Sequence, residues 1–198
     1  MSTETEADPR QRVLDVAGDL FAEHGFDDVT MADIAQAADV SRATVFNYFG
    51  SKHALVEALT ERVLDVFRLM LDAALADETT PTPALVRKLF EDMALGIESQ
   101  RSFMRGAFRE IARIQLGLDE GLVAQQANAE ANARLLQLVE RGQARGDINN
   151  ELPTQSIALA FHALANGTIT TWLYHDESGS LVDAMRGAAD VFLSSVAA

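Results

Sequence analysis

Apolar residues recur every three or four positions along most of the chain, the spacing that predicts amphipathic helices. The first such run includes Val13, Leu14, Ala17 and Phe21. No segment has the alternation of apolar and polar residues that is typical of a strand. Proline, glycine and capping residues divide the pattern into about nine expected helices, at residues 9–24, 31–38, 42–49, 52–76, 82–99, 102–117, 119–145, 154–175 and 180–196.

The ends of these segments carry residues that begin and end helices. Short polar side chains accept hydrogen bonds from the free N–H groups of a first turn, and glycine adopts the left-handed conformation after a last turn. The expected N-caps are Asp8, Thr30, Ser41, Ser51, Thr154 and Ser180, and the expected C-terminal glycines are Gly25 and Gly50.

Three of the expected helices fall within the first fifty residues. A turn of only a few residues, at Asp39 and Val40, joins the second to the third, which is the pattern of a helix-turn-helix. The sequence therefore predicts an all-α fold with an N-terminal three-helix helix-turn-helix domain at residues 1–50. We expect residues 51–198 to form a second helical domain.

The composition agrees with a helical protein and excludes several classes of chemistry. The 198 residues are 48% hydrophobic but only 7% aromatic. Because the chain has no cysteine, disulfides, iron–sulfur clusters and cysteine nucleophiles are excluded. The acidic N-terminus has no apolar run, so we expect no signal peptide, no membrane span and a cytoplasmic location.

Charge is distributed unevenly along the chain. The net charge of −14 argues against nonspecific binding to nucleic acid. Residues 40–53 nevertheless carry a net charge of +2, whereas residues 1–39 and residues 54–198 each carry −8. A short basic window on an acidic molecule calls for a specific explanation.

The helix expected at residues 42–49 lies inside this basic window. Val45 and Phe49 can dock it on the preceding helices, while the remaining side chains stay exposed. Arg42 suits a bidentate contact to guanine, and Asn47 can pair with adenine in the major groove. The side chains suited to phosphate are Thr44, Tyr48 and Lys52. The alternative is that this polar helix is only the solvated face of a helical bundle.

The order of residues in this region resembles the DNA-binding domain of the TetR family of bacterial transcriptional regulators. The resemblance covers about forty residues, from Phe21 to Leu59. The segments that carry it are Phe21-Ala22-Glu23-His24-Gly25-Phe26, Thr30-Met31-Ala32-Asp33-Ile34-Ala35, Ala38-Asp39-Val40-Ser41, Thr44-Val45-Phe46-Asn47-Tyr48-Phe49 and Ser51-Lys52.

The sequence departs from the family pattern at four positions. Asp39 occupies a turn position where the family often has glycine, and Phe46 stands where the family often has a phosphate-binding tyrosine. Tyr48 replaces a frequent histidine and can restore a phosphate contact, and His53 replaces a frequent glutamate. These departures keep the helix-turn-helix but change the individual DNA contacts.

The resemblance implies a sequence-specific DNA-binding transcriptional regulator. Its default mode is a dimeric repressor that a small-molecule effector releases from a double-stranded DNA operator, with activation as the open alternative. The second domain, residues 51–198, is then the effector-binding and dimerisation domain. The residues expected at the DNA are Thr30, Ser41, Arg42, Ala43, Thr44, Phe46, Asn47, Tyr48 and Lys52.

The last two helices, at about 154–175 and 180–196, are the expected homodimer interface. The segment from Ile157 to Gly167 is apolar nearly all round and rich in small residues, which permit close approach of helices. Two copies can form a four-helix bundle, as in TetR-like proteins. The alternative is that these helices form the core of a monomer.

A pocket for the effector is expected among apolar and polar residues of the central helices. The candidates are Phe67, Met70, Met93, Met104, Phe108, Asn132, His162, Asn166 and Trp172. The alternative for these residues is ordinary core packing. A second candidate, for an anionic effector, is the series Arg101, Arg105, Arg109 and Arg113, although a solvated face partly paired with Glu98 and Glu110 is the preferred interpretation.

No pattern of catalytic residues stands out. The sequence has no glycine-rich phosphate loop, no H-E-x-x-H and no G-x-S-x-G, and its four histidines have no spacing typical of a metal site. We therefore expect neither an enzyme nor a cofactor or metal. The competing class is a helical dimer whose tip binds another protein, and retardation of DNA that weakens as salt rises separates the two.

Overall fold

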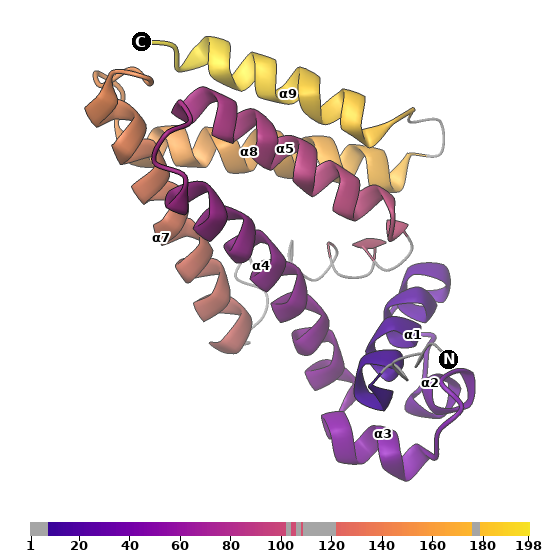
Figure 1. Ribbon diagram of the computed structural model, residues 1–198. Coiled ribbons are helices and arrows are strands. Elements are labelled where there is room, and N and C mark those ends of the chain that lie inside the picture. Colours follow the sequence, from indigo (N-terminus) through magenta and orange to yellow (C-terminus); the bar gives the residue numbers. More distant parts are fainter. Residues whose placement is uncertain (1–7, 102–103, 106–107, 109–121, 176–178) are drawn as a thin grey trace, which may run out of the picture. The chain divides into compact units, whose positions relative to one another are not determined.

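A computed structural model describes residues 8–101, 104–105, 108, 122–175 and 179–198. These residues form eight α-helices, labelled α1 to α5 and α7 to α9 in Figure 1. The chain divides into two compact units, Met1–Val63 with Ser102–Ala124, and Leu64–Arg101 with Gln125–Ala198. The helix α4 (Lys52–Ala76) contributes its first half to one unit and its second half to the other.

The first unit is a three-helix arrangement followed by the start of α4. Its helices are α1 (Pro9–His24), α2 (Met31–Ala37) and α3 (Arg42–Phe49). One residue from each of these helices, Val13, Ile34 and Val45, is fully buried in a shared core that Leu55 of α4 joins. The core therefore fixes α3 against α1, α2 and α4, as expected for a helix-turn-helix.

The turn between α2 and α3 has an unusual backbone conformation. Asp39 has a φ of 53° and is the non-glycine residue with positive φ among the described residues. An L side chain in this left-handed region crowds its own backbone, whereas glycine does not. The turn geometry for which the TetR family often uses glycine is thus present here with aspartate.

The second unit consists of the rest of α4 with α5 (Thr82–Glu98), α7 (Leu122–Arg145), α8 (Thr154–Tyr174) and α9 (Leu181–Ser195). The rings of Phe90 on α5, Phe161 on α8 and Phe192 on α9 pack together, with centroids 4.8 to 6.3 Å apart. Figure 1 shows α5 and α9 running side by side, in agreement with this aromatic core. Two guanidiniums of α7 bind α4: Arg134 donates to Asp72, and Arg141 donates to the last carbonyls of α4.

Most of the expected helix ends are confirmed. Asp8, Thr30, Ser41 and Ser180 are N-caps whose side chains accept from a backbone N–H of the following turn, and Ser51 accepts from the N–H of Ala54. The expected cap at Thr154 is wrong. Pro153 occupies the N-cap position of α8 and provides no side-chain cap. The hydroxyl of Thr154 instead donates to the side-chain oxygen of Gln143.

The helix count is eight in the described residues instead of about nine. The helix expected at residues 102–117 lies almost entirely outside the described residues, and so do the acidic N-terminal residues before Asp8. Within the part of the chain that the structure describes, no helix has the length and apolar character required to span a bilayer.

Candidate DNA-binding interface

Short hydrogen bonds hold α3 in place at both ends. At its start, the Ser41 hydroxyl accepts from the backbone N–H of Thr44 at 3.0 Å and lies 2.8 Å from the Thr44 hydroxyl. At its end, Gly50 takes a φ of 72° and its N–H donates to the carbonyl of Phe46. An eight-residue helix is marginal alone, so these caps and the core beneath it define its position.

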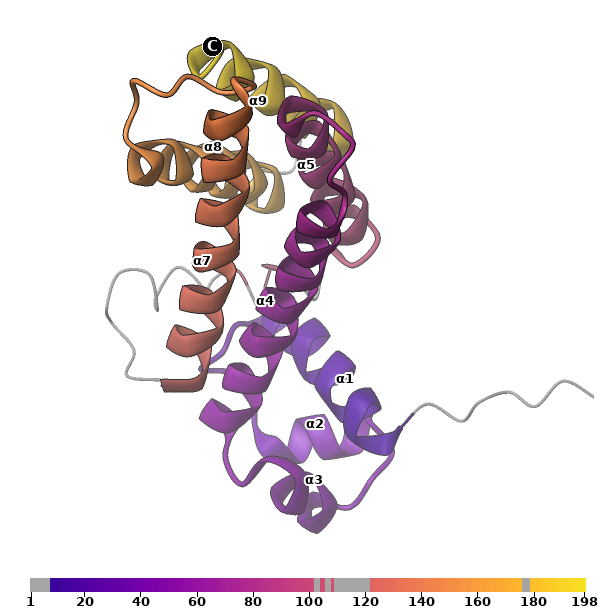
Figure 2. The same cartoon turned by 60° about the vertical axis from the view of Figure 1, so that its left-hand side comes forward.

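The helix α3 has one buried face and one exposed face. Val45 is fully buried and Phe49 is 7% exposed, and both face the core of the first unit. In the view of Figure 2, α3 lies at one edge of the three-helix arrangement. The exposed side chains are Ser41, Arg42, Ala43, Phe46, Asn47 and Tyr48, and Thr44 is half-buried. The helix α3 and its N-cap therefore hold seven of the nine residues that the sequence predicts at the DNA, all except Thr30 and Lys52.

Two cation–aromatic contacts orient arginines at this face. The guanidinium of Arg42 lies 5.6 Å from the centroid of the Phe46 ring, one helical turn away on α3. The guanidinium of Arg10, at the exposed start of α1, lies 4.8 Å from the centroid of Phe49. Arg10 therefore sits beside the last turn of α3 and brings a further positive charge to it.

Sequence reasoning missed Arg10 as a candidate DNA contact. Arg10 and Arg12 lie two residues apart within residues 1–39, which carry a net charge of −8, so the sequence does not distinguish one arginine from the other. Only the structure separates them, because Arg12 donates from Nε to the carbonyl of Ala38 while Arg10 stays exposed. The signal available in the sequence was the position of Arg10 in the first turn of α1, two residues after the Asp8 cap.

Thr30 is engaged within the first turn of α2. Its backbone N–H and its hydroxyl both donate to the carboxylate of Asp33, at 2.8 and 2.7 Å, and its hydroxyl accepts from the N–H of Asp33. These bonds from Thr30 lower the pKa of the Asp33 carboxyl. Both donors of Thr30 are committed to this capping box, so the DNA contact expected of Thr30 stays a prediction.

Lys52 is engaged inside the first unit. Its ammonium donates to the carbonyl oxygens of Phe26 and Val29, at 2.5 and 2.9 Å, and lies 4.1 Å from the centroid of the Phe26 ring. The phosphate contact expected of Lys52 stays a prediction, and this geometry disfavours it because an ammonium has only three donors.

The residues expected at an effector pocket are divided between the two units. Phe67, Phe161 and His162 form an aromatic cluster in the second unit, with His162 edge-on to both rings. Burial lowers the pKa of His162. Met93, Asn132 and Asn166 are half-buried on α5, α7 and α8. Met104 instead packs against the core of the first unit, and the buried residue Phe108 falls in the same unit.

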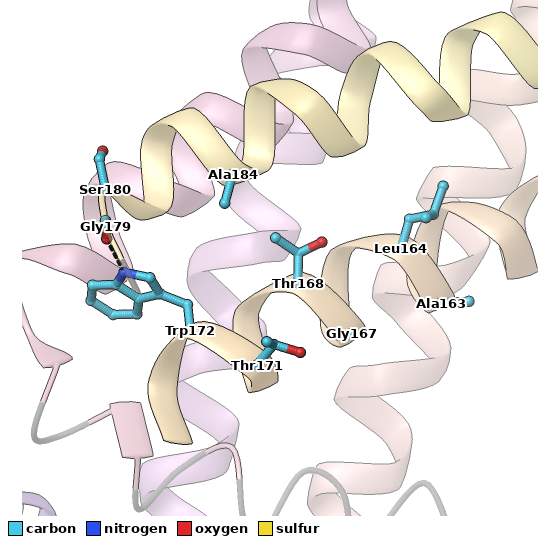
Figure 3. A pocket seen from close by; sticks show the side chains of 9 residues that line it. All are labelled: Ala163, Leu164, Gly167, Thr168, Thr171, Trp172, Gly179, Ser180 and Ala184. Carbon is cyan, nitrogen blue, oxygen red and sulfur yellow. Dashed lines mark hydrogen bonds between the residues drawn. The ribbon is translucent and has the colours of Figure 1, made fainter. Parts of the chain in front are cut away.

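Trp172 and Met70, which are among the pocket candidates, line cavities of the second unit. Trp172 lines a cavity of about 520 Å³ between α8 and the start of α9, where its indole N–H donates to the carbonyl of Gly179 (Figure 3). Met70 lines a second cavity, of about 410 Å³, between α4 and α5. No group of three or more His, Cys, Asp or Glu suited to a metal ion occurs among the described residues.

The preferred interpretation of the arginine series as a solvated face is wrong for Arg101. Its guanidinium lies over the Trp172 ring at 4.5 Å and donates to the carbonyls of Trp172 and His175, which end α8. Glu98 accepts from the N–H of Leu181 at the start of α9. Arg109 and Arg113, with Glu110, lie outside the described residues.

Comparisons with known proteins agree with this geometry. Residues 13–59 match the family model described as bacterial regulatory proteins of the tetR family, and this range contains α2, α3 and the start of α4. Along 201 residues the chain is 24% identical to the HTH-type transcriptional regulator TtgR of Pseudomonas putida, covering 96% of this chain and 93% of that protein.

A second relative and a solved structure extend the comparison. The chain is 39% identical over 70 residues to the HTH-type transcriptional regulator UidR of Escherichia coli, covering 33% of this chain and 36% of that one. The structure of the fatty acid degradation regulator FadR from Bacillus halodurans has the same fold, with a TM-score of 0.82, 18% identity, and coverage of 96% of this chain and 97% of that one.

Three findings agree: the family model matches the helix-turn-helix, α3 is capped and has an exposed polar face, and relatives such as TtgR align along nearly the whole chain. The chain belongs to the TetR family of bacterial regulatory proteins and is a helix-turn-helix transcriptional regulator that binds DNA.

Proposed function

We propose that this protein is a homodimeric repressor that inserts α3 of each protomer into the major groove of an operator. The observation that carries the proposal is the division of α3, with Val45 and Phe49 buried and a polar, basic face exposed. Such a helix can enter a groove without losing its docking contacts. A dimer that occupies a promoter excludes polymerase, so repression is the default outcome.

The exposed residues of α3 divide by chemistry into base contacts and phosphate contacts. Arg42 is assigned to guanine, because a guanidinium can form two parallel hydrogen bonds to N7 and O6 of that base. Asn47 is assigned to adenine for the same geometric reason. Thr44 and Tyr48 are assigned to phosphate, and Ala43 and Phe46 to apolar contact with thymine methyl groups. Arg10, exposed beside Phe49, is assigned to phosphate at the flank.

The charge distribution supports a single orientation on DNA. The protein has a net charge of −14, which repels a polyanion, but residues 40–53 carry +2. Approach of DNA through any surface other than this window is therefore unfavourable. A bacterial operator-binding protein of this kind acts in the cytoplasm, by binding and not by catalysis.

The outer faces of α8 and α9 are suited to a homodimer interface. The helix α8 has no Asp, Glu, Lys or Arg over its 21 residues, yet Leu159 on it is 69% exposed. The exposed side of α9 includes Val191, which is 60% exposed. We assign these two exposed apolar side chains, together with the uncharged helix α8, to a contact with a second copy of the chain.

Small residues would let two copies approach closely at this surface. Ala163, Gly167 and Ala184 line the cavity between α8 and α9 together with Thr168 (Figure 3). A Cβ added at Gly167 or at Gly187 meets no atom within 4 Å in the single chain. We assign these residues to a four-helix contact with the α8 and α9 of a second copy.

A small-molecule effector is proposed to bind the second unit and to release the operator. The aromatic cluster of Phe67, Phe161 and His162 and the half-buried Asn166 offer apolar walls with a few polar groups, the composition of a ligand site. Release requires only that the effector bind more tightly to a conformation that does not bind DNA.

Selection of DNA from a random-sequence pool tests the proposed function. Purified protein should enrich one duplex sequence, with two related half-sites whose centres lie about 34–36 Å or a multiple of that distance apart. Affinity for the selected duplex should fall steeply as salt rises from about 50 to 200 mM. Enrichment of no sequence, with retention of a protein partner instead, would contradict the proposal and support a protein-binding tip.

A further inference from the structure

The loop between α1 and α2 converges on the first residue of α4. Carbonyl oxygens of Phe26 and Val29 lie 2.5 and 2.9 Å from Nζ of Lys52, and the carbonyl of Asp27 lies at 3.5 Å. Carbonyl oxygens that point to one place repel each other unless a donor or cation lies between them. The ammonium of Lys52 therefore stabilises this conformation of the loop.

One aromatic ring, that of Phe26, also contacts the same ammonium. The ammonium lies 4.1 Å from the centroid of the Phe26 ring, which is a cation–π distance. The Phe26 ring in turn packs edge-on against the His53 ring at 5.1 Å and against Phe21 of α1 at 5.5 Å. We call the bonds of Lys52 to Phe26 and Val29, together with the Phe26 ring, the Lys52 contact.

The Lys52 contact joins the start of α4 to the start of α2. Val29 is 2% exposed and directly precedes Thr30, the N-cap of α2. The helix α2 is joined to α3 by the turn at Asp39 and packs against α3 in the core. A shift of the loop thus displaces the helix on which α3 rests.

We infer that Lys52 is a positioning residue for DNA binding that does not itself contact DNA. This inference rests on the proposed operator binding and changes the role of one residue within it. Lys52 holds the loop at residues 25–29 against α4, so that α2 and α3 present their exposed residues in the geometry that fits the operator. Its loss lowers the fraction of protein in the binding-competent arrangement, which weakens the apparent affinity by that fraction.

Lys52→Met separates positioning from phosphate contact. For positioning, the Kd for the selected operator rises about tenfold, the Kd for a scrambled duplex changes less than about twofold, and the slope of log K against log[salt] is unchanged. A phosphate contact in each protomer would instead reduce the magnitude of that slope by about 1.8 and weaken both duplexes equally. That second result would overturn the inference, as would unchanged operator binding.

Two further variants keep the test decisive. Phe26→Leu cannot remove a phosphate ligand, yet it removes the ring beneath the ammonium, so it should also weaken operator binding selectively. In the double variant with Lys52→Met, the fold increase in the Kd for the operator should be smaller than the product of the two single increases, because both substitutions disrupt the same contact. Multiplicative effects would overturn the inference. Phe26→Leu also provides the selectivity readout if Lys52→Met does not fold, which far-UV circular dichroism checks.

Matched controls separate this test from the proposed function. Lys88→Met removes an exposed lysine from the second unit, where Lys88 pairs with Asp92, and should leave operator affinity and salt slope unchanged. Lys52→Arg keeps a cation with several donors and should restore most of the selectivity. If the wild-type chain selects no operator, the proposed function itself is contradicted. If the wild-type chain selects an operator but Lys52→Met alters the salt slope, only the inference about Lys52 is contradicted.

Discussion

Nε of Arg12, on α1, donates to the carbonyl oxygen of Ala38 at a distance of 3.1 Å. Ala38 is the C-cap of α2 and is 1% exposed, so its carbonyl has little access to water. The bond crosses 26 positions of sequence and holds the last turn of α2 on α1, directly before the turn that leads to α3. Arg12 thus contributes to the helix-turn-helix through its fold, whereas Arg10 stays exposed and is proposed to contact DNA.

Arg12→Leu should lower the free energy of unfolding by about 1–3 kcal/mol, because it leaves a buried carbonyl without its charged donor. The measurement is urea unfolding followed by circular dichroism. Arg10→Leu is the matched control, with little change in unfolding. For DNA binding the order reverses: Arg10→Leu should reduce the magnitude of the salt slope by about 1.8 per dimer, and Arg12→Leu should not. Equal effects of both variants on unfolding would contradict the assignment.

Asp39→Gly should stabilise the protein. Asp39 has a φ of 53°, where a side chain is strained and glycine is not, while glycine adds flexibility to the unfolded chain. The net gain should be up to about 1 kcal/mol in urea unfolding. Asp39→Ala keeps the Cβ and serves as the control, which should give no gain. A gain of the same size for alanine would point to removal of the aspartate charge instead of relief of strain.

Stability should fall in mild acid because of His162. Burial against Phe67 and Phe161 lowers its pKa from the ordinary value of 6.5. The unfolded chain therefore takes up a proton at a higher pH than the folded chain, so stability is complete above about pH 6.5 and is lost as the pH falls below it. Urea midpoints between about pH 7.5 and 5.5 measure this loss.

His162→Gln should flatten that pH dependence, because glutamine does not titrate. The control is His24→Gln, which removes an exposed histidine at the end of α1 and so measures the effect of a histidine-to-glutamine change outside the aromatic cluster. If His24→Gln flattens the profile and His162→Gln does not, the assignment to His162 is wrong.

Gly167→Arg should convert a dimer to a monomer. A side chain at Gly167 has open space in the single chain, so the fold should be retained, but a charged arginine would be buried between two copies of α8. Sedimentation velocity at micromolar concentration measures the change. Ala133→Arg on the exposed side of α7 is the control and should stay dimeric. A dimer that tolerates Gly167→Arg places the interface elsewhere.

The sequence was sufficient for local features of the fold. Capping depends on a few adjacent residues, and the caps expected at Thr30, Ser41 and Ser180 are confirmed. The exception is Thr154, whose hydroxyl binds Gln143, eleven positions earlier in the sequence. A partner that distant in sequence competes with the local cap and leaves no trace in the local pattern.

Long side chains were the hardest to assign from the sequence. Arg12, Lys52 and Arg101 each carry a charge that a sequence pattern places on the surface. In the structure all three donate to backbone carbonyls between 23 and 74 positions away. Aliphatic stems bury readily while their charged ends find carbonyl acceptors, so the role of such a residue depends on tertiary contacts. The exposed face of α3, by contrast, could be predicted from the helical spacing of its apolar residues alone.

The most direct test of the account is the affinity of Arg42→Ala for the selected operator and for a scrambled duplex, compared with the wild type at the same salt concentration. Arg42 is proposed to contact guanine. The difference in binding free energy between the selected operator and the scrambled duplex should therefore shrink by about 1–3 kcal/mol for each half-site, which lowers the ratio of the two affinities. Fluorescence anisotropy with both duplexes at about 100 mM salt measures the ratio. An unchanged ratio, with Arg42→Ala binding both duplexes as the wild type does, would contradict the claim that the exposed face of α3 recognises the operator.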